Sequence, residues 1–347
     1  MFKDRNTSRR DFIAGSSAAG SGMSDPTGDP YLVQVGRRAM ACQFQVYFNA
    51  GQYDDAAEIA IGALDRVEHL ESILTIYRDE SEVSRINREA FHTPVPVGRH
   101  VMTLSVMGER LYEATDGAFD LTAGPLSEVW GFARRAGSVP SEAELQAALA
   151  QVGSEHVVID QQQSTIRFRR AGMQLNFGGI GKGYALDQCS AILQEAGIGD
   201  FLFHGGRSSV MARGDRFGSD GGWKVGLIHP QRPQTRLAEI RLMNRALSTS
   251  GSQMQSFQHE GRRFGHILDP RTGRPSEGVF SATVLADTAA QADALSTAFY
   301  VMGPAKVQQF CEQHRDVSAI LVTPREGKGQ TDIMALNLSD EDFHVVQ

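Results

Sequence analysis

The 347-residue chain has only three cysteines, and none is placed for a disulfide framework or a metal site. Cys42, Cys189 and Cys311 are odd in number and widely spaced, and the chain contains no CxxC pair. Disulfide-rich folds and zinc ribbons need such pairs, so the sequence excludes both classes. We expect the three thiols to be buried apolar side chains.

Long apolar runs and an excess of basic residues are also missing. No stretch approaches the ~18 consecutive apolar residues that mark a membrane-spanning helix, so no membrane span is expected. The 34 basic residues are outnumbered by 41 acidic ones and are scattered, and the net charge is −7. Nucleic acid is therefore not an expected partner. A hydrophobic content of 41% is enough for the core of a globular protein of one large or two ordinary domains.

The first 29 residues differ in character from the rest of the chain. The stretch "SRRDFIAGSSAAGSG", from Ser8, places a Phe-Ile pair shortly after Arg9 and Arg10, as twin-arginine export signals do. Its apolar region is short and rich in serine, so a disordered tail on a cytoplasmic protein is the alternative. We expect an export signal and a periplasmic or cell-envelope location, and we assign residues 30–347 to the folded domain.

Hydrophobic periodicity predicts a mixed α/β unit from Tyr31 onward. Alternation predicts a strand pair over 31–48, and apolar residues at helical spacing predict a helix over 54–75, with Asp54 or Asp55 as its N-cap. Further helices are expected at 99–114, 141–151, 181–196 and 288–301 and from Pro304, and strands at 155–160, 165–170, 173–176 and 317–323, with several short ones over 201–284. No repeat or low-complexity linker divides the chain, which favours one compact unit with two lobes.

The stretch "NFGGIGKGYALDQ", Asn176 to Gln188, concentrates four glycines and a lysine just before a predicted helix. A Walker loop would need Gly at Asn176 and Ser or Thr at Gly183, and a dinucleotide fingerprint starting at Gly179 would need its third glycine at Tyr184. Neither pattern fits. Two readings remain: a turn that binds phosphate at a helix N-terminus, or a structural turn whose glycines supply positive φ and close packing.

Three further segments carry polar residues suited to a site. In "TDGAFDLTAGPL", Phe119 and Asp120 are either a ring platform and a hydrogen-bond acceptor or a helix stop with a buried ring. In "RRFGHILDPRTGRP", His266 is either a proton acceptor or a hydrogen-bonded structural residue. In "ADALSTAFYVMG", Asp293 and Thr297 lie one helical turn apart, as hard oxygen ligands for Mg²⁺ would, or else form a coincidental pair.

In combination and in this order, these segments resemble the motifs of the ApbE family of FAD:protein FMN transferases, from about Tyr31 to Thr323. The matching stretches are "SEVSRIN", "TDGAFDLTAGPLSEVWGF", "NFGGIGKGYALD", "GGWKVGLIHP", "ALSTSG", "GHILDPRTGRP" and "ADALSTAFYVMG". The resemblance implies a two-lobed, T-fold-like α/β architecture with mixed or antiparallel sheets and packed helices. It also implies magnesium-dependent transfer of FMN from FAD to a Thr or Ser hydroxyl of a target protein, with release of AMP.

The resemblance also implies roles for individual residues. Asp293, Thr297 and the backbone carbonyl of Gly181 correspond to the Mg²⁺ ligands. His266 is the candidate for activating the acceptor hydroxyl, because a neutral imidazole can take a proton near pH 7. The residues at FAD-contacting positions are Met40, Tyr77, Ala118, Phe119, Asp120, Asn176, Lys182 and His266.

The chain departs from the family's usual motifs at four places, which bear on the nucleotide contacts and the acceptor specificity. Ala41-Cys42 replaces Gly-Thr, Asn176 replaces a frequent Asp, Arg207 stands where Asp or Asn is usual, and Ser252-Gln253 follows "TSG". Two alternatives to the transferase stay open. One is an Mg²⁺-dependent FAD pyrophosphatase, in which water replaces the protein hydroxyl and the products are FMN and AMP. The other is a flavin-binding carrier without catalysis, which these departures make possible. The retained Asp293 and Thr297 favour an enzyme over a carrier.

Overall fold

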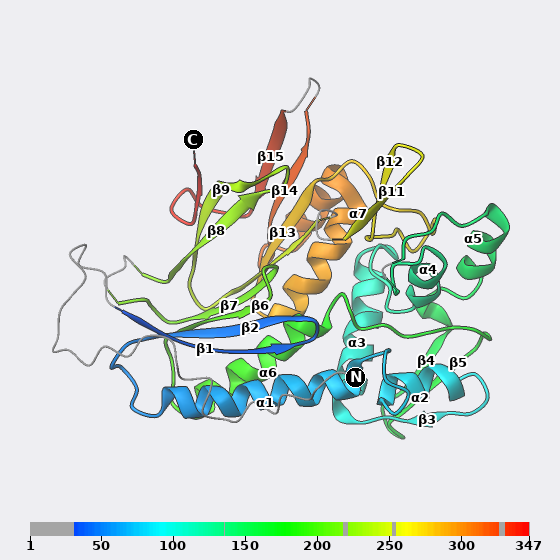
Figure 1. Ribbon diagram of the computed structural model, residues 1–347, viewed down its shortest axis with the longest axis horizontal. Helices are drawn as coiled ribbons and strands as arrows, with labels where there is room; N and C mark the ends of the chain where they lie inside the picture. The colour runs from blue at the N-terminus through cyan, green and yellow to red at the C-terminus, as the bar shows by residue number, and fades with distance from the viewer. Residues whose placement is uncertain (1–30, 135, 218–220, 252–254, 326–329, 347) are drawn as a thin grey trace, which may run out of the picture.

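The structure is a computed structural model that describes residues 31–134, 136–217, 221–251, 255–325 and 330–346. The predicted export signal and the Ser252-Gln253 departure lie outside the described residues. Figure 1 shows two lobes, one built on a large sheet with helices against it and a second one, with further helices and small sheets, at the right of the view. The predicted α/β fold of antiparallel sheets with packed helices is confirmed.

The first lobe is built on an eight-stranded sheet in which every pairing is antiparallel. In sheet order its strands are β1 (Leu32–Ala39), β2 (Cys42–Asn49), β6 (Phe201–Gly205), β7 (Ser209–Arg213), β10 (Ala246–Ser250), β13 (Ser281–Ala286), β14 (Ser318–Pro324) and β15 (Thr331–Leu336). Alternation along β2 sends Phe44, Val46 and Phe48 into the main core and Tyr47 to the other face. The predicted strand pair over 31–48 is thus confirmed as β1 and β2.

Three helices cover one face of this sheet, α1 (Ala56–Leu74), α6 (Gly181–Glu195) and α7 (Ala289–Gln313). Helix α1 begins after its N-cap Asp55, as predicted, although the Asp55 side chain makes no capping hydrogen bond. Helix α7 contains a kink at Gly303, whose φ of 76° is not helical, directly before Pro304. This break separates two helical segments, so the helices predicted over 288–301 and from Pro304 are confirmed as the two arms of α7.

A second, three-stranded sheet packs on the opposite face and forms a separate apolar core with it. Its order is β16 (Phe343–Val345), β9 (Arg232–Leu242) and β8 (Trp223–His229). Trp223 and Ile240 from this sheet meet Leu202, Leu285 and other apolar residues of the large sheet. The large sheet therefore packs apolar residues on both faces, against the helices on one side and against the second sheet on the other.

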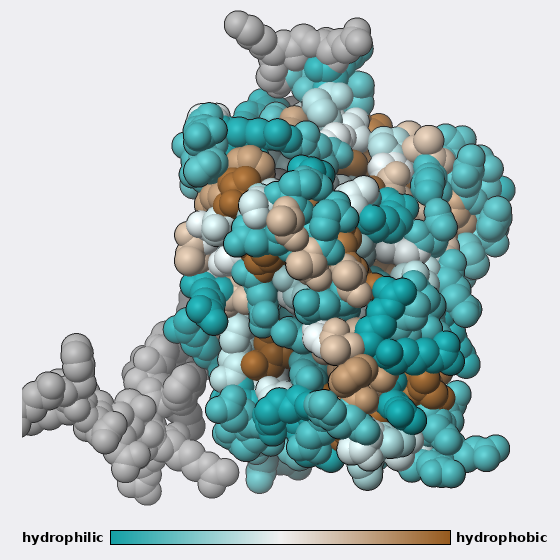
Figure 2. Space-filling view, turned by 90° about the vertical axis from the view of Figure 1, so that its right-hand side faces the viewer, coloured by the Kyte–Doolittle hydropathy of each residue, from teal (hydrophilic) through white to brown (hydrophobic). Residues whose placement is uncertain are grey.

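The second lobe combines short helices with a three-stranded sheet and a hairpin (Figure 1). Its elements are α2 (Glu82–Glu89), α3 (Arg99–Ala114), α4 (Gly124–Val129), α5 (Glu142–Leu149), the 3₁₀ turn η1 (Ser154–His156), the sheet β3 (Val95–Pro96), β5 (Thr165–Phe168), β4 (Val157–Asp160), and the hairpin β11 (Ser256–His259) and β12 (Arg262–Gly265). Figure 2 shows the face on this side as largely hydrophilic, with hydrophobic residues in small separate groups.

The strand predicted over 173–176 is wrong. The Leu175 N–H donates to the Asn87 side chain (2.8 Å), the Asn87 amide donates back to the Leu175 carbonyl (3.0 Å), and the Asn176 N–H donates to the Leu121 carbonyl (2.8 Å). A side-chain amide therefore takes the place of a neighbouring strand, and periodicity cannot distinguish the two. None of the helices in the described ranges has the length and apolar character that a membrane-spanning segment requires.

Candidate active site

The glycine-rich turn leads into α6, and its last glycine lies against the start of α7. A Cβ atom at Gly183 would lie 2.1 Å from the carbonyl oxygen of Ala289 and 2.7 Å from the amide nitrogen of Ala290. None of the four glycines of the turn has a positive φ, so the structural reading that they supply positive φ is wrong. Close packing is the part of that reading that the structure supports: Gly183 lets two helices meet backbone to backbone.

Asp187, one turn further along α6, joins the same two helices by hydrogen bonds. Its carboxylate accepts the amide hydrogens of Ala289 (2.7 Å) and Ala290 (2.9 Å), the first residues of α7. These are N–H groups that a helix N-terminus leaves without an intrahelical partner. Loss of solvent around the carboxylate raises the pKa of Asp187 to about 6, although both amide bonds oppose the shift. The start of α6 and the start of α7 are thus held together as one unit.

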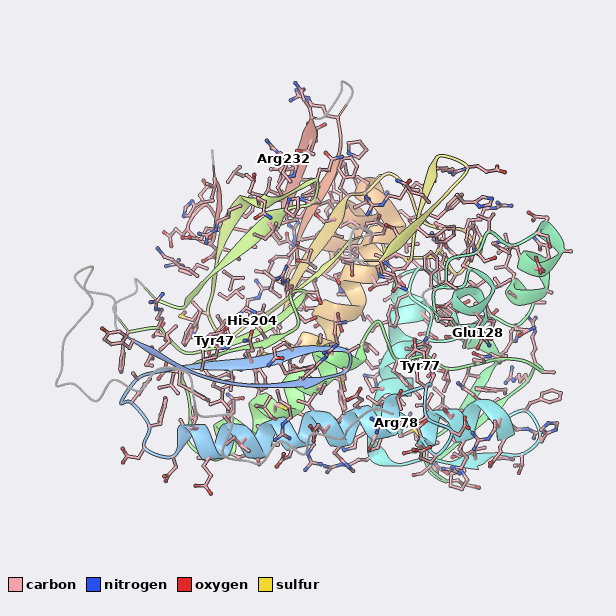
Figure 3. The ribbon with its side chains drawn as sticks, in the orientation of Figure 1. Tyr47, Tyr77, Arg78, Glu128, His204 and Arg232 are labelled. Carbon is pink, nitrogen blue, oxygen red and sulfur yellow. The ribbon has the colours of Figure 1, made fainter. Side chains whose placement is uncertain are left out.

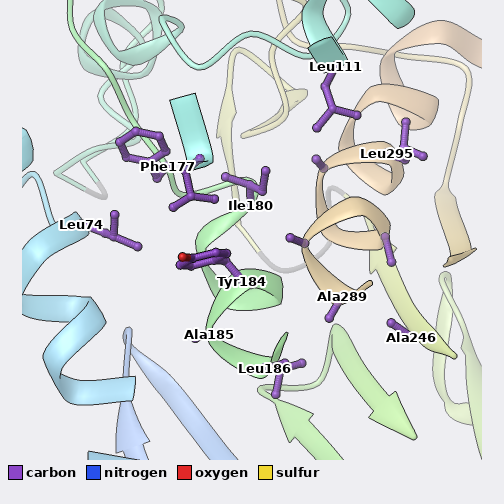
Figure 4. Close-up of a cluster of buried hydrophobic side chains, with 14 of the residues drawn as sticks. Leu74, Leu111, Phe177, Ile180, Tyr184, Ala185, Leu186, Ala246, Ala289 and Leu295 are labelled. Carbon is purple, nitrogen blue, oxygen red and sulfur yellow. The ribbon is translucent and has the colours of Figure 1, made fainter. Parts of the chain in front are cut away.

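The apolar residues of the glycine turn anchor it in the main core. Figure 4 shows Phe177 and Ile180 among buried side chains between α1 and α7. The Phe177 carbonyl accepts the amide hydrogens of Ile180 (3.1 Å) and Gly181 (2.7 Å), and the Asn176 side chain accepts that of Gly178 (2.8 Å). The protein's own hydrogen bonds and core contacts therefore define the shape of the turn.

A pocket of about 430 Å³ opens in front of the glycine turn, between the two lobes. This volume lies in the usual range for small-molecule sites. One wall comes from the first lobe and the other from the segments after α3 and β12. The lining residues are Cys42, Ala118, Phe119, Asp120, Ala123, Ser127, Asn176, Gly178, Gly179, Lys182, Gly206, Arg207, Ser208, Thr249, Ser250, Gly251, His266, Ile267, Leu268, Pro270, Asp293 and Thr297.

Asp293 is the acidic centre of the first-lobe wall. Only 4% of the residue is exposed, and its carboxylate accepts hydrogen bonds from four residues. The Gly183 amide lies at 3.1 Å, the Ser248 hydroxyl at 3.1 Å, the Ser209 hydroxyl at 3.3 Å, and the Lys182 ammonium at 3.4 Å from both carboxylate oxygens. A buried carboxylate needs such partners, because burial without them costs several kcal/mol. The lysine and the carboxylate are thus placed together at the N-terminus of α6.

Thr297 follows Asp293 on the same side of α7, as the i,i+4 spacing predicts. Its hydroxyl lies 3.2 Å from that of Ser250, and both residues line the pocket with Asp293. Within the described ranges, no group of three or more His, Cys, Asp and Glu side chains is close enough to hold a metal ion. The donors at hand are hard oxygens, which fit Mg²⁺ if substrate oxygens complete its coordination. Gly181, the third predicted ligand, is buried at the start of α6 and is not part of the lining.

His266 lies on the second-lobe wall, directly after β12. Its Nδ1 is 3.0 Å from the carbonyl oxygen of Gln255, so Nδ1 carries the hydrogen and Nε2 is the basic nitrogen. The Gln255 side chain in turn donates to the Phe132 carbonyl (2.9 Å). Burial lowers the pKa of His266 below its usual 6.5, with a smaller contribution from the charge of Lys182 and an opposing one from the bond to Gln255. The imidazole is therefore neutral at pH 7 and able to accept a proton.

Asp120 also lines the second-lobe wall, but its carboxylate bonds within its own lobe. It accepts the amide and hydroxyl of Thr122 (both 2.7 Å) and the hydroxyl (2.7 Å) and amide (3.2 Å) of Ser154. Burial raises the pKa of Asp120, and these four hydrogen bonds counteract the rise. Phe119 is 4% exposed, and its ring lies 3.2 Å from where a Gly179 Cβ would be, so the two walls meet at Gly179.

The structure gathers most, but not all, of the predicted site residues. Ala118, Phe119, Asp120, Asn176, Lys182, His266, Asp293 and Thr297 line one pocket. Met40 is half-buried in the β1–β2 turn and is not part of the lining. Tyr77 is 74% exposed in the segment between α1 and α2 (Figure 3), also outside the lining. Both stay predictions as FAD contacts.

Several residues of the pocket were not expected from their sequence. Cys189 and Cys311 are buried as expected, but Cys42 is half-buried and lines the pocket, so its interpretation as a core side chain was wrong. Ser248 and Ser250 point from β10 toward α7, where they contact Asp293 and Thr297. Their i,i+2 spacing in "ALSTSG" is the signal that places both on one face of a strand.

Comparison with known proteins agrees with this fold and site. The model of the ApbE family matches residues 40–321. The FAD:protein FMN transferase of Escherichia coli K12 is 30% identical over 263 residues, which cover 74% of each chain. The ApbE protein of Thermotoga maritima superposes with a TM-score of 0.79 at 28% identity, over 88% of this chain and 97% of that one. The flavinyl transferase ApbE of Pseudomonas stutzeri gives 0.77 at 30% identity, over 88% and 95%. The family model alone spans most of the folded residues, so this chain belongs to the ApbE family.

Proposed function

We propose that this protein transfers FMN from FAD to a Thr or Ser hydroxyl of a target protein and releases AMP. The relatives named as FAD:protein FMN transferases support flavin transfer to a protein. The observation that carries the proposal is the pocket itself, which brings Lys182 and Asp293 at the start of α6 into the same cavity as a neutral His266. Anion binding and proton transfer, the two tasks of a phosphoryl transfer, thus meet in one place.

The α6 end of the pocket suits the diphosphate of FAD. Gly178, Gly179 and Lys182 line this end, where the partial positive charge of a helix N-terminus adds to that of the ammonium group. Lys182 can leave Asp293 for a phosphate oxygen, because the two are only 3.4 Å apart and Asp293 keeps its bonds to Gly183, Ser209 and Ser248. The carboxylate therefore stays satisfied when the lysine moves.

His266 suits the hydroxyl of the acceptor. Its Nδ1 hydrogen is held by the Gln255 carbonyl, so Nε2 takes the proton as the acceptor oxygen bonds to the phosphorus atom of the FMN half. The bond from this phosphorus to the bridging oxygen breaks, and that oxygen leaves with AMP. No covalent intermediate with this protein is needed, because the acceptor oxygen displaces the bridging oxygen from the phosphorus atom in a single step.

Asp293 and Thr297 would hold a Mg²⁺ ion, together with oxygens of the substrate. When bound, the ion would neutralise negative charge on the phosphate oxygens, which stabilises the transition state by several kcal/mol. The proposed coordination rests on hard oxygen donors from two adjacent turns of α7 that line the same pocket. The Gly181 carbonyl is the least supported of the three ligands, because that residue is outside the lining.

The test is to incubate the full chain with FAD, Mg²⁺ and candidate acceptor domains and to weigh the acceptors by intact mass spectrometry. We expect the mass of one esterified FMN on one acceptor, equimolar AMP in solution, and no modification of an acceptor whose target Thr or Ser is replaced by Ala. Free FMN and AMP with unmodified acceptors would instead identify an FAD pyrophosphatase. FAD that remains intact and bound would identify a carrier.

We propose further that the protein is exported, because Arg9 and Arg10 precede Phe12 and Ile13 as in twin-arginine signals. Its acceptor would then be a periplasmic or cell-envelope flavoprotein domain. Fractionation of cells that produce the full chain tests the location independently of the activity.

A further inference from the structure

Arg207 is an exposed residue that lines the pocket from the turn between β6 and β7. Among the residues that the structure describes, its guanidinium has no hydrogen bond and no ion pair. Lys182, the other lysine or arginine of the lining, shares its charge with Asp293 at 3.4 Å. Arg207 therefore brings a positive charge to the pocket that no carboxylate of the described chain offsets.

The backbone that carries Arg207 is held on both sides, although its side chain is free. The Gly206 N–H donates to the Gln43 carbonyl (2.9 Å), and the Thr249 N–H donates to the Ser208 carbonyl (2.8 Å). Gly206 has a φ of 69°, and a Cβ there would lie 3.2 Å from that of Cys42. The turn is thus fixed between β2 and β10, and binding a ligand would require only the side chain to become ordered.

The neighbours of Arg207 favour an anionic ligand. The two carboxylates of the lining, Asp120 and Asp293, each already accept hydrogen bonds from four donor groups of the protein. Ser208, Thr249 and Ser250 add hydroxyl groups to the same wall. A guanidinium presents paired N–H donors that match two oxygens of a phosphate. This wall therefore fits phosphate oxygens better than a sugar or an uncharged ring.

We propose that Arg207 binds the diphosphate of FAD as a second cation beside Lys182, and that it makes this enzyme prefer the dinucleotide over uncharged flavins. The inference rests on the proposed function and adds a residue-specific contact to it. Arg207 stands at one of the places where the sequence departs from the motifs that it resembles, so the contact would belong to this chain's own sequence.

The test is to titrate the full chain with FAD, ADP and riboflavin, with and without Arg207→Gln. ADP carries the diphosphate without the flavin, and riboflavin carries the flavin without phosphate. We expect roughly 10- to 100-fold weaker binding of both FAD and ADP in Arg207→Gln, the range for a lost charge-assisted hydrogen bond. Riboflavin affinity should be unchanged, Arg207→Lys should retain part of the affinity, and Arg207→Asp should lose more than Arg207→Gln.

Arg167→Gln is the matched control, because Arg167 is exposed on β5 and is not part of the lining. Its FAD and ADP affinities should equal those of the wild type. Equal affinities in Arg207→Gln and the wild type would overturn the inference while leaving the proposed function intact. An increase only in the KM of the acceptor protein would also overturn it, since Arg207 would then bind the acceptor. If the wild type itself bound neither FAD nor ADP, the proposed function would fail first.

Discussion

Replacing Gly183 by Ala should destabilise the protein by forcing apart the starts of α6 and α7. The new methyl group would lie 2.1 Å from the Ala289 oxygen and 2.4 Å from the Ala289 carbonyl carbon. Ordinary contact begins at 3.4 Å, so the backbones would have to separate by about 1.3 Å. Both partner atoms belong to the backbone, so no rotamer change of a side chain can relieve the clash.

The expected loss of stability is the sum of two destabilising effects and one stabilising effect. Overpacking in a tight core costs ~1–3 kcal/mol, and a backbone clash this close lies at the upper end. Separation also weakens the two hydrogen bonds by which Asp187 caps α7, and loss of a cap costs ~1 kcal/mol. The better helix propensity of Ala recovers at most ~1 kcal/mol. We therefore expect the free energy of unfolding to fall by about 3 kcal/mol.

Urea denaturation followed by far-UV circular dichroism measures this loss, provided that the slope with urea is the same in both proteins. Gly181→Ala is the matched control, because the added methyl would meet only the Leu74 side chain, at 3.9 Å. It lies in the same helix and gains the same propensity, so its stability should equal or slightly exceed that of the wild type. Equal stabilities of Gly183→Ala and Gly181→Ala would refute the argument that helix contact requires this glycine.

Three further predictions concern the reaction and the location. The pKa of His266 is lowered below 6.5, and only the neutral imidazole accepts a proton, so kcat/KM for transfer should fall on acidification only below pH 6.5. In His266→Ala this decrease at acidic pH should vanish. The rate of transfer in this variant should be lower by roughly 10²–10⁴-fold, with a much smaller loss of FAD affinity. FAD binding that disappears together with activity would make His266 a binding group instead. Asp293→Ala should abolish the gain in FAD affinity that Mg²⁺ produces in calorimetric titrations, and Thr297→Ala, which removes a neutral ligand that water can replace, should retain most of it; a gain that persists in Asp293→Ala would place the metal elsewhere. The double substitution Arg9→Lys and Arg10→Lys should keep the protein in the cytoplasm. Equal extracytoplasmic amounts of this variant and the wild type would contradict export.

The sequence predicted the elements whose signals are local. Helix α1 shows its apolar stripe over five turns, and β2 alternates between core and opposite face, so the helix and the strand pair were placed within two residues of their observed limits. The segment 173–176 has an equally strand-like composition, but its partner is the Asn87 side chain, 88 positions away in the chain. No local pattern contains that information. Strand β15, which completes the large sheet at one edge, was missed for a different reason, because its residues are only partly buried and show no clear alternation.

The pocket shows a similar limit. The glycine turn indicated a helix N-terminus at the site, but the partner that explains Gly183 is Ala289, more than a hundred residues later. The β1–β2 turn is also unexpected, because Met40 and Ala41 both have positive φ, a conformation for which Asn-Gly is the usual sequence. The resemblance to the family's motifs predicted that Asp293 and His266 lie in one site. Their positions along the chain alone do not indicate that they are close in space. The hydroxyl groups around Asp293 follow only from the strand register of β7 and β10.

The contact between the starts of α6 and α7, made by Gly183 and Asp187, has a consequence for how ligands enter and leave. Gly183 and Asp187 fasten the two helix starts backbone to backbone, and with them the first-lobe wall that carries Lys182 and Asp293. The residues of that wall cannot move apart without breaking the contacts that Gly183 and Asp187 make with α7. If the pocket widens during ligand exchange, the wall that moves is therefore the opposite one, which belongs to the other lobe. If product release limits turnover, as it does in many enzymes, the motion of that second wall sets the rate, and substitutions far from the phosphates can slow or speed the enzyme without touching its chemistry.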